Sequence, residues 1–200
     1  MKHFFLRLLV TTFFSTLAFA QGDTWQIDPA HSSAQFAVKH MGISTVRGAF
    51  SKVGGTVQYD AAHPEKAVIE VTIDASSVDT RVEPRDKDLR SANFFDVEKF
   101  PNITFKSKKV ESAGGGKMKV IGDLSIRGVT NEVILQVEGP NGPTKDPRGN
   151  QHMGAAATTQ ISRKAFGVNG APGGVADDVA IVIDVEMIQR AVAPAGAGTK

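Results

Sequence analysis

The sequence predicts an all-β domain of antiparallel strands with one short helix. Beyond residue 20, apolar and polar side chains alternate with period two in segment after segment. This pattern is typical of strands with one buried face and one wet face. The segments follow one another through short turns, which favours a meander, and no repeat of fixed period is present. Eight antiparallel strands can close into a barrel that holds one small ligand, but a β-sandwich produces the same pattern.

Residues 1–20 are predicted to be a signal peptide outside the fold. Lys2 and Arg7 give a positive start, an apolar run follows, and Ala18-Phe19-Ala20 has the small-x-small form of a cleavage site. The apolar run is shorter than the roughly 20 residues that span a bilayer. We therefore expect export, cleavage near Ala20 and a periplasmic or secreted protein, with no stable membrane insertion of the mature chain.

Composition narrows the function classes. The leader carries two of the 23 basic side chains and none of the 21 acidic ones, so the mature chain has 21 of each and a formal charge of zero. A neutral chain gives no reason to expect a nucleic-acid partner. The absence of Cys excludes disulfides and thiolate metal sites. Residues 21–190 are enough for one domain with a sizeable core. The small residues of 191–200 predict a flexible tail.

The first half of the domain contains five alternating segments. The clearest is 69–73, where Ile69, Val71 and Ile73 alternate with polar side chains, as a half-buried strand requires. Adjacent glycines at 54 and 55 indicate a bulge or sharp bend. The five predicted strands are 25–27, 34–40, 46–50, 57–59 and 69–73.

The segment 85–105 interrupts the strand pattern. Pro84 suits the first turn of a short helix that extends to about Arg90. Four of the seven Phe beyond the leader follow within this segment, and a simple connection would not need so much aromatic surface. We expect the segment to plug or line one end of a cavity whose wall is the surrounding strands. The four are Phe94, Phe95, Phe100 and Phe105.

The second half returns to alternating strands. Gly114-Gly115-Gly116 predicts a hairpin tip, and residues 139–151, rich in Gly, Pro and Asn, predict a long exposed loop. A second glycine-rich loop is expected after Phe166. The predicted strands are 103–107, 120–126, 133–137, 155–161 and 179–187.

Eight short motifs occur in order along the chain. They are Trp25-x-Ile27-Asp28-x-x-His31-Ser32, Phe36-x-Val38-x-His40, Gly48-x-Phe50, Arg85-Asp86-x-x-Leu89, Phe94-Phe95-Asp96, Phe100-Pro101-x-x-Thr104-Phe105, Gly122-x-Leu124-x-Ile126-Arg127-Gly128-Val129-Thr130 and Arg163-x-x-Phe166-Gly167. The set resembles the YceI-like family of lipid- or polyisoprenoid-binding proteins, and the resemblance extends from about Trp25 to Met187. It implies an extended antiparallel lipocalin-like β-barrel, often periplasmic, that holds a long isoprenoid or fatty chain.

Apolar side chains on the inner strand faces are the candidate ligand-binding residues. At any single position a packed core is the commoner explanation, and the resemblance favours a tunnel lining for the group. Each buried methylene contributes about 0.8 kcal/mol, so ten outweigh the net ~1 kcal/mol of a hydrogen bond, and we expect a binder tolerant of head groups. The candidates are Phe36, Val38, Phe50, Ile69, Val71, Leu89, Phe94, Phe95, Phe105, Leu124, Ile126, Leu135, Phe166, Ile181 and Ile183.

Three polar residues complete the candidate binding site. His40 shares the alternating face of Phe36 and Val38, where a hydrogen bond to a lipid head group competes with an ordinary rim histidine. Arg85 and Asp86 are expected near the rim of the tunnel, although a solvated helix start explains them equally well.

No metal or catalytic residues are predicted. The four histidines beyond the leader include no His-x-His or His-x₃-His pair. The sequence also lacks a Gly-x-Ser-x-Gly elbow, a thiol nucleophile and a phosphate-binding loop.

The leading hypothesis is an exported carrier, without a cofactor, for a polyisoprenoid, an isoprenoid quinone or a fatty lipid. One alternative is an enzyme that acts on a lipid-like or small substrate through His40, Asp86 and Arg85, which requires these three to converge. Another is a β-sandwich interaction module without a cavity. The ligand's chain length and head group stay open, as does formation of a homodimer.

Overall fold

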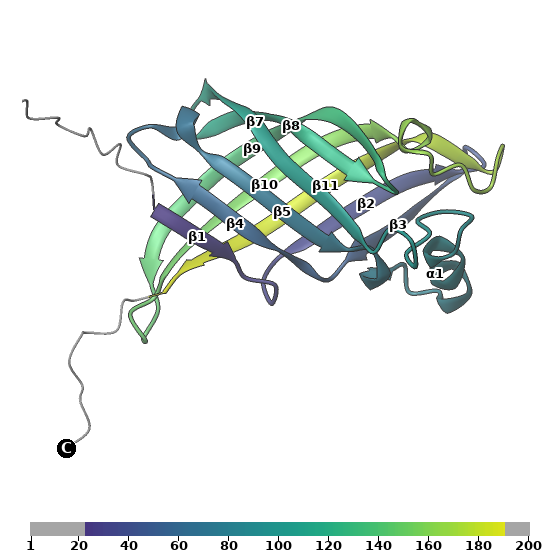
Figure 1. Ribbon diagram of the computed structural model, residues 1–200, viewed down its shortest axis with the longest axis horizontal. Coiled ribbons are helices and arrows are strands. Elements are labelled where there is room, and N and C mark those ends of the chain that lie inside the picture. The colour runs from purple at the N-terminus through teal and green to yellow at the C-terminus, as the bar shows by residue number, and fades with distance from the viewer. Residues whose placement is uncertain (1–22, 191–200) are drawn as a thin grey trace, which may run out of the picture.

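The computed structural model describes residues 23–190, whose strands close into one antiparallel barrel (Figure 1). The predicted signal peptide and C-terminal tail lie outside the described residues. Neighbours around the barrel are β1, β4, β5, β7, β8, β9, β10 and β11, and β11 pairs with β1 to close it. Their bounds are β1 Asp23–Ile27, β4 Val53–Tyr59, β5 Val68–Asp74, β7 Asn102–Gly114, β8 Lys117–Ile126, β9 Val129–Lys145, β10 Gln151–Ser162 and β11 Val175–Gln189. The β-sandwich alternative is therefore wrong.

The barrel closes at β11, which pairs with two N-terminal strands along different parts of its length. β2 (Ser33–His40) pairs with the first part of β11, between Val175 and Asp184. β1 pairs only with its end, at Met187 and Ile188. β3 (Ser44–Phe50) and the short β6 (Val78–Asp79) extend the sheet beyond β2. These strands lengthen the wall at the end of the barrel where α1 lies (Figure 1).

The helix α1 (Glu83–Arg90) is placed as the sequence predicts, with Pro in its first turn. The remaining helical segments are single 3₁₀ turns: η1 Pro64–Lys66, η2 Ala75–Ser77 and η3 Lys164–Phe166. No helix within residues 23–190 is long and apolar enough to cross a membrane.

The predicted loop over 139–151 is wrong, because β9 continues to Lys145 and β10 already begins at Gln151. Gly139 and Gly142 adopt positive φ values of 106° and 109°. The β9–β10 register shifts at the same place. A Cβ at Gly142 would lie 2.8 Å from the carbonyl oxygen of His152, so the strands approach too closely there for another residue. The glycines thus form bulges that let a Gly- and Pro-rich segment stay in the sheet.

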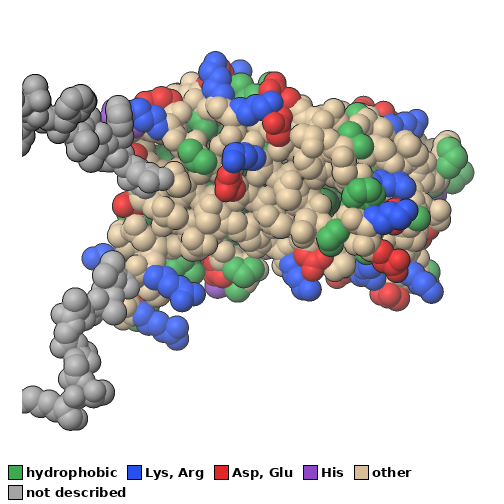
Figure 2. Space-filling view, viewed as in Figure 1, with side chains coloured by type: hydrophobic (Ala, Val, Ile, Leu, Met, Phe, Trp, Pro, Cys, Tyr) green, Lys and Arg blue, Asp and Glu red, His purple; other side chains and the backbone are tan. Residues whose placement is uncertain are grey.

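The outer face of the barrel carries charges of both signs with scattered apolar side chains (Figure 2). Several charges pair across strands: Lys106 Nζ lies 2.7 Å from Glu70 Oε1, and Lys108 Nζ lies 2.7 Å from Asp123 Oδ1. Exposed pairs of this kind contribute about 0–1 kcal/mol each, so they do not hold the fold together.

The apolar interior is divided into three clusters of buried side chains. One lies at the α1 end and includes Phe50, Phe94 and Phe166. The second surrounds Trp25 near β1, and the third contains Val120, which is fully buried. Ala155, Ile183 and other half-buried residues contact both the second and the third cluster. The space between the clusters is the candidate site.

Candidate functional site

A cavity of about 250 Å³ lies inside the barrel. Among the described residues, only apolar atoms are exposed to it. The volume is just below the roughly 300–1,000 Å³ typical of small-molecule pockets. The cavity is long, because inward residues of β11 line it from Val179 to Met187, which corresponds to roughly 26 Å of strand at about 3.3 Å per residue. A small volume spread over this length makes the space narrow. A narrow apolar tunnel fits a chain better than a compact ring system.

Most of the residues proposed from the sequence line this cavity. Leu124, Leu135 and Ile181 are only half-buried although they point inward, which a solid core would not allow. Their role in ligand binding stays a prediction. The candidates that line the cavity are Phe36, Val38, Phe50, Ile69, Val71, Leu89, Phe94, Phe95, Phe105, Leu124, Ile126, Leu135, Phe166, Ile181 and Ile183.

Arg85, Asp86 and His40 do not line the cavity. Arg85 Nε donates to Thr80 Oγ1 at 2.8 Å, and Asp86 accepts from Thr80 N–H at 2.9 Å. Asp86 is only 3% exposed, so both residues fix the start of α1 to the segment after β6. His40 is exposed at the end of β2, opposite Ser44.

The enzyme hypothesis required His40 to meet Arg85 and Asp86. None of the hydrogen bonds or ion pairs of residues 23–190 joins His40 to either of them. The arrangement on which that hypothesis depended is therefore not formed.

Residues 83–101, which we call the lid, line one end of the cavity through Leu89, Phe94 and Phe95. Phe94 and Phe95 lie in the turn after α1, where Phe95 N–H donates to the Leu89 carbonyl at 2.9 Å. The Phe95 ring stands edge-on to Phe50, with centroids 5.5 Å apart. Phe50 in turn contacts Phe36, with centroids 5.9 Å apart. The lid thus continues the aromatic lining of the barrel wall.

Two arginines tie the lid to the barrel through backbone carbonyls. Arg90 donates to the carbonyls of Ser76 at 2.9 Å and Val78 at 2.8 Å. Arg127, in the β8–β9 turn, donates to Gly167 at 2.9 Å and to Ala92 at 2.7 Å. A guanidinium presents several donors in one plane, so each arginine joins two segments. Sequence reasoning missed this role because no local pattern reveals a distant carbonyl.

Phe94 separates the cavity from a polar surface crevice, since its ring lines both. Asn93, Arg127 and Asn169 are among the residues of the crevice. On the loop after η3, a Cβ at Gly170 would lie 2.6 Å from the Phe94 ring, so the two are in close contact. Phe94 therefore forms part of the wall between the tunnel and the surface at this end.

The comparisons with known proteins agree with this architecture. A family model described as the YceI-like domain matches residues 25–187. The chain belongs to the YceI-like family. A UPF0312 protein of Vibrio cholerae is 37% identical to this YceI-like chain over 161 residues, which cover 80% of the chain and 84% of the relative.

Solved structures share the YceI-like barrel. BcnA of Burkholderia cenocepacia superposes with a TM-score of 0.72 at 27% identity, covering 80% of this chain and 98% of BcnA. A polyisoprenoid binding domain from Saccharophagus degradans, implicated in plant cell wall breakdown, has a TM-score of 0.62 at 12% identity. It covers 82% of this chain and 97% of that domain, and the likeness concerns the fold alone. The expected extended antiparallel barrel is confirmed.

Replacing Phe94 and Phe95 together by Ala should reduce several-fold the occupancy of the cavity by the apolar ligand that the sequence predicts, because the change removes two rings from the lining. The loss of stability per site should be smaller than the roughly 3–5 kcal/mol of Phe→Ala in a filled core, since both rings border a void. Lipid extraction and urea unfolding measure the two effects. Phe100→Ala is the matched control, because Phe100 packs on Gly128 and does not line the cavity. If the double variant and Phe100→Ala both lost occupancy in proportion to their loss of stability, Phe94 and Phe95 would be ordinary core residues.

A second group of polar side chains lies outside the YceI-like cavity, where the β1–β2 turn meets β10 and β11. His31 Nδ1 is 2.6 Å from Asp28 Oδ2, and this contact raises the pKa of His31 and lowers that of Asp28. His152 Nδ1 is 2.7 Å from Glu186 Oε1, which raises the pKa of His152. The pKa of Asp146 falls to about 2, chiefly because it accepts from the Asn150 side chain. The cluster therefore combines imidazoles and carboxylates on the outer face.

Proposed function

We propose that this protein is an exported carrier that sequesters a polyisoprenoid or an isoprenoid quinone inside its barrel. The observation that carries the proposal is the wall of the cavity, which is long, narrow and apolar throughout the described residues. An acyl chain of similar length would make the same apolar contacts with this wall, so a fatty lipid belongs to the same ligand class.

Energetics favour a chain over a polar ligand. Burial of ten methylenes supplies about 8 kcal/mol. The costs of association reduce this gain, as in any complex. A polar head group would find no hydrogen-bonding partner among the atoms that face the tunnel, and burying it there would cost several kcal/mol. We therefore place the head group outside the apolar part of the tunnel, at one of its ends.

The comparisons support the proposal at the level of the family. The Saccharophagus degradans domain is described as polyisoprenoid binding, but at 12% identity it supports the fold and not the ligand. Export rests on the leader pattern of residues 1–20, from which we infer a periplasmic or secreted location after cleavage near Ala20.

A chain-length series tests the proposed function. An environment-sensitive dye bound to delipidated protein is displaced by straight-chain and isoprenoid alcohols of increasing length. The affinity should rise by up to about fourfold per methylene, the equivalent of about 0.8 kcal/mol, until the chain fills the tunnel. Longer chains should bring no further gain, and methylation of the hydroxyl should change little. An affinity that follows the head group and ignores chain length would contradict the proposal.

A further inference from the structure

Three side chains of the outer cluster are close enough to share one cation. Asp28 and His31 come from the β1–β2 turn and Glu186 from β11, and one potential ligand atom from each lies within 4.8 Å of the other two. Around a tetrahedral zinc ion with bonds of about 2.0–2.2 Å, neighbouring ligand atoms lie roughly 3.4 Å apart. Side-chain movements of about an ångström would therefore complete the site.

The backbone holds these three residues in place. Asp28 N–H donates to the Glu186 carbonyl at 2.8 Å. In return, Glu186 N–H donates to Ser32 Oγ at 3.1 Å. Ala30 N–H donates to Asp28 Oδ1 at 3.0 Å and orients that carboxylate. The turn that carries two of the groups is thus bonded directly to the residue that carries the third.

Two further side chains, His152 and Asp146, hold the Glu186 carboxylate in place through a chain of polar contacts. His152 Nδ1 contacts one carboxylate oxygen, Glu186 Oε1, and its Nε2 lies 3.3 Å from Asp146 Oδ2. Carboxylates that bind metals are themselves held by hydrogen bonds of this kind. The His31 imidazole distinguishes the group from an ordinary acidic patch, since nitrogen ligands suit zinc and similar ions, whereas calcium and magnesium prefer oxygen.

We propose that Asp28, His31 and Glu186 bind one divalent transition-metal ion, with water in the remaining position and with His152 and Asp146 orienting Glu186. The site lies on the seam of the barrel. β1 and β11 share only the pairs Gln26–Ile188 and Ile27–Met187, so a bound ion would cross-link the turn after β1 to β11 where the sheet closes. The proposal departs from the sequence prediction of no metal site.

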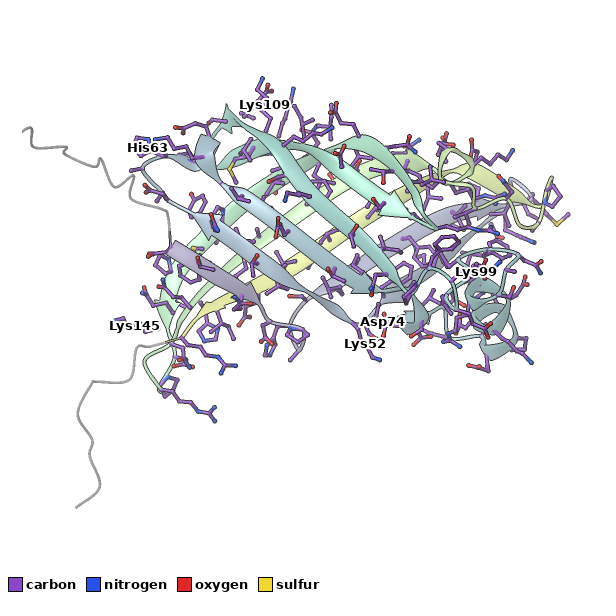
Figure 3. The ribbon with its side chains drawn as sticks, in the orientation of Figure 1. Lys52, His63, Asp74, Lys99, Lys109 and Lys145 are labelled. Atoms are coloured by element: carbon purple, nitrogen blue, oxygen red, sulfur yellow. The ribbon has the colours of Figure 1, made fainter. Side chains whose placement is uncertain are left out.

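Calorimetric titration of zinc chloride into the purified protein, produced without a histidine tag, tests the site. One equivalent of zinc should bind, and His31→Ala and Glu186→Gln should each weaken binding at least tenfold. His63→Ala is the control: His63 pairs with Glu65 in the β4–β5 loop, and Figure 3 shows it at the end of the barrel away from Lys99 of the lid. Zinc should also raise the melting temperature of the wild type by several degrees and leave that of His31→Ala unchanged.

Calcium at the same concentration should give neither effect. Circular dichroism verifies that each variant is folded. If Glu186→Gln does not fold, Asp28→Asn serves as the second variant that removes a metal ligand. Equal zinc binding by the wild type and His31→Ala would overturn the site, as would the absence of binding at millimolar zinc. Lipid binding should not respond to zinc, because the cluster lies on the outer face, so the site and the carrier function fail independently.

Discussion

Replacing Ala155 by Phe should abolish lipid binding and leave the barrel folded. Ala155 lies on β10 and faces the cavity between the second and third apolar clusters. A phenyl ring at this position would occupy the middle of a space of only about 250 Å³ and divide the tunnel. The added ring enters an existing void, so the usual penalty of overpacking, about 1–3 kcal/mol, should be small or absent.

The matched control is Ala180→Phe. Ala180 is exposed on β11, so this substitution introduces the same phenyl ring on the outer face of the same sheet. Dye displacement should show at least a tenfold loss of affinity for Ala155→Phe and none for Ala180→Phe. The melting temperatures of the wild type, Ala155→Phe and Ala180→Phe should lie close together. Normal lipid binding by folded Ala155→Phe would mean that the ligand lies elsewhere.

Replacing Arg163 by Met should destabilise the protein by about 3–5 kcal/mol, because several buried carbonyls lose their hydrogen-bond donor at once. Arg163 is only 6% exposed. Its guanidinium donates to the carbonyls of Ala176 at 2.9 Å, Val168 at 2.7 Å, Gly170 at 2.8 Å and Val175 at 2.9 Å. Val168 and Gly170 belong to the loop between β10 and β11, whereas Val175 and Ala176 begin β11, so one side chain holds the loop against the strand that follows it. Each buried carbonyl left without a donor costs about 1–3 kcal/mol.

Urea unfolding measures this effect, with Lys164→Met as the control because Lys164 is the exposed neighbour. Arg163→Lys should not restore stability, since an ammonium cannot reach four carbonyls in the plane of a guanidinium. The loop should also become sensitive to protease, and Phe94 should lose its contact with Gly170. A stability for Arg163→Met within about 1 kcal/mol of Lys164→Met would contradict this account.

Period-two alternation predicted the strands well because side chains of a strand alternate strictly between two faces. Residues 69–73 and 179–187 illustrate this, since their odd-numbered positions are all apolar and all line the cavity. The same pattern could not separate a barrel from a sandwich, because both bury one face of each strand. The ordered family motifs supplied that distinction.

Alternation shows which face of a strand a residue is on, but not how far along the barrel it lies. This explains why His40 was wrongly predicted to line the cavity. Phe36 and Val38 line the cavity, but His40 is the last residue of β2, beside an exposed turn that ends in Ile43. The loop prediction over 139–151 failed for a different reason. Gly and Pro mark turns in general, and only the partner strand shows that Gly139 and Gly142 form bulges inside a ladder.

The outer cluster could not be found from local sequence. His31 and Glu186 are far apart in the chain, and they meet because the sheet closes through β11. The contacts of Arg163 and Arg127 likewise depend on loops whose shape the sequence does not reveal.

Native mass spectrometry of the protein isolated from the periplasmic fraction tests the central claim most directly. We expect a mature chain that begins at Gln21 and carries one bound lipid, which organic extraction identifies as a polyisoprenoid, an isoprenoid quinone or another long apolar chain. Ala155→Phe should appear without lipid in the same experiment. A ligand-free wild-type protein that also fails to take up an added polyprenol would contradict the claim that the barrel is a lipid carrier.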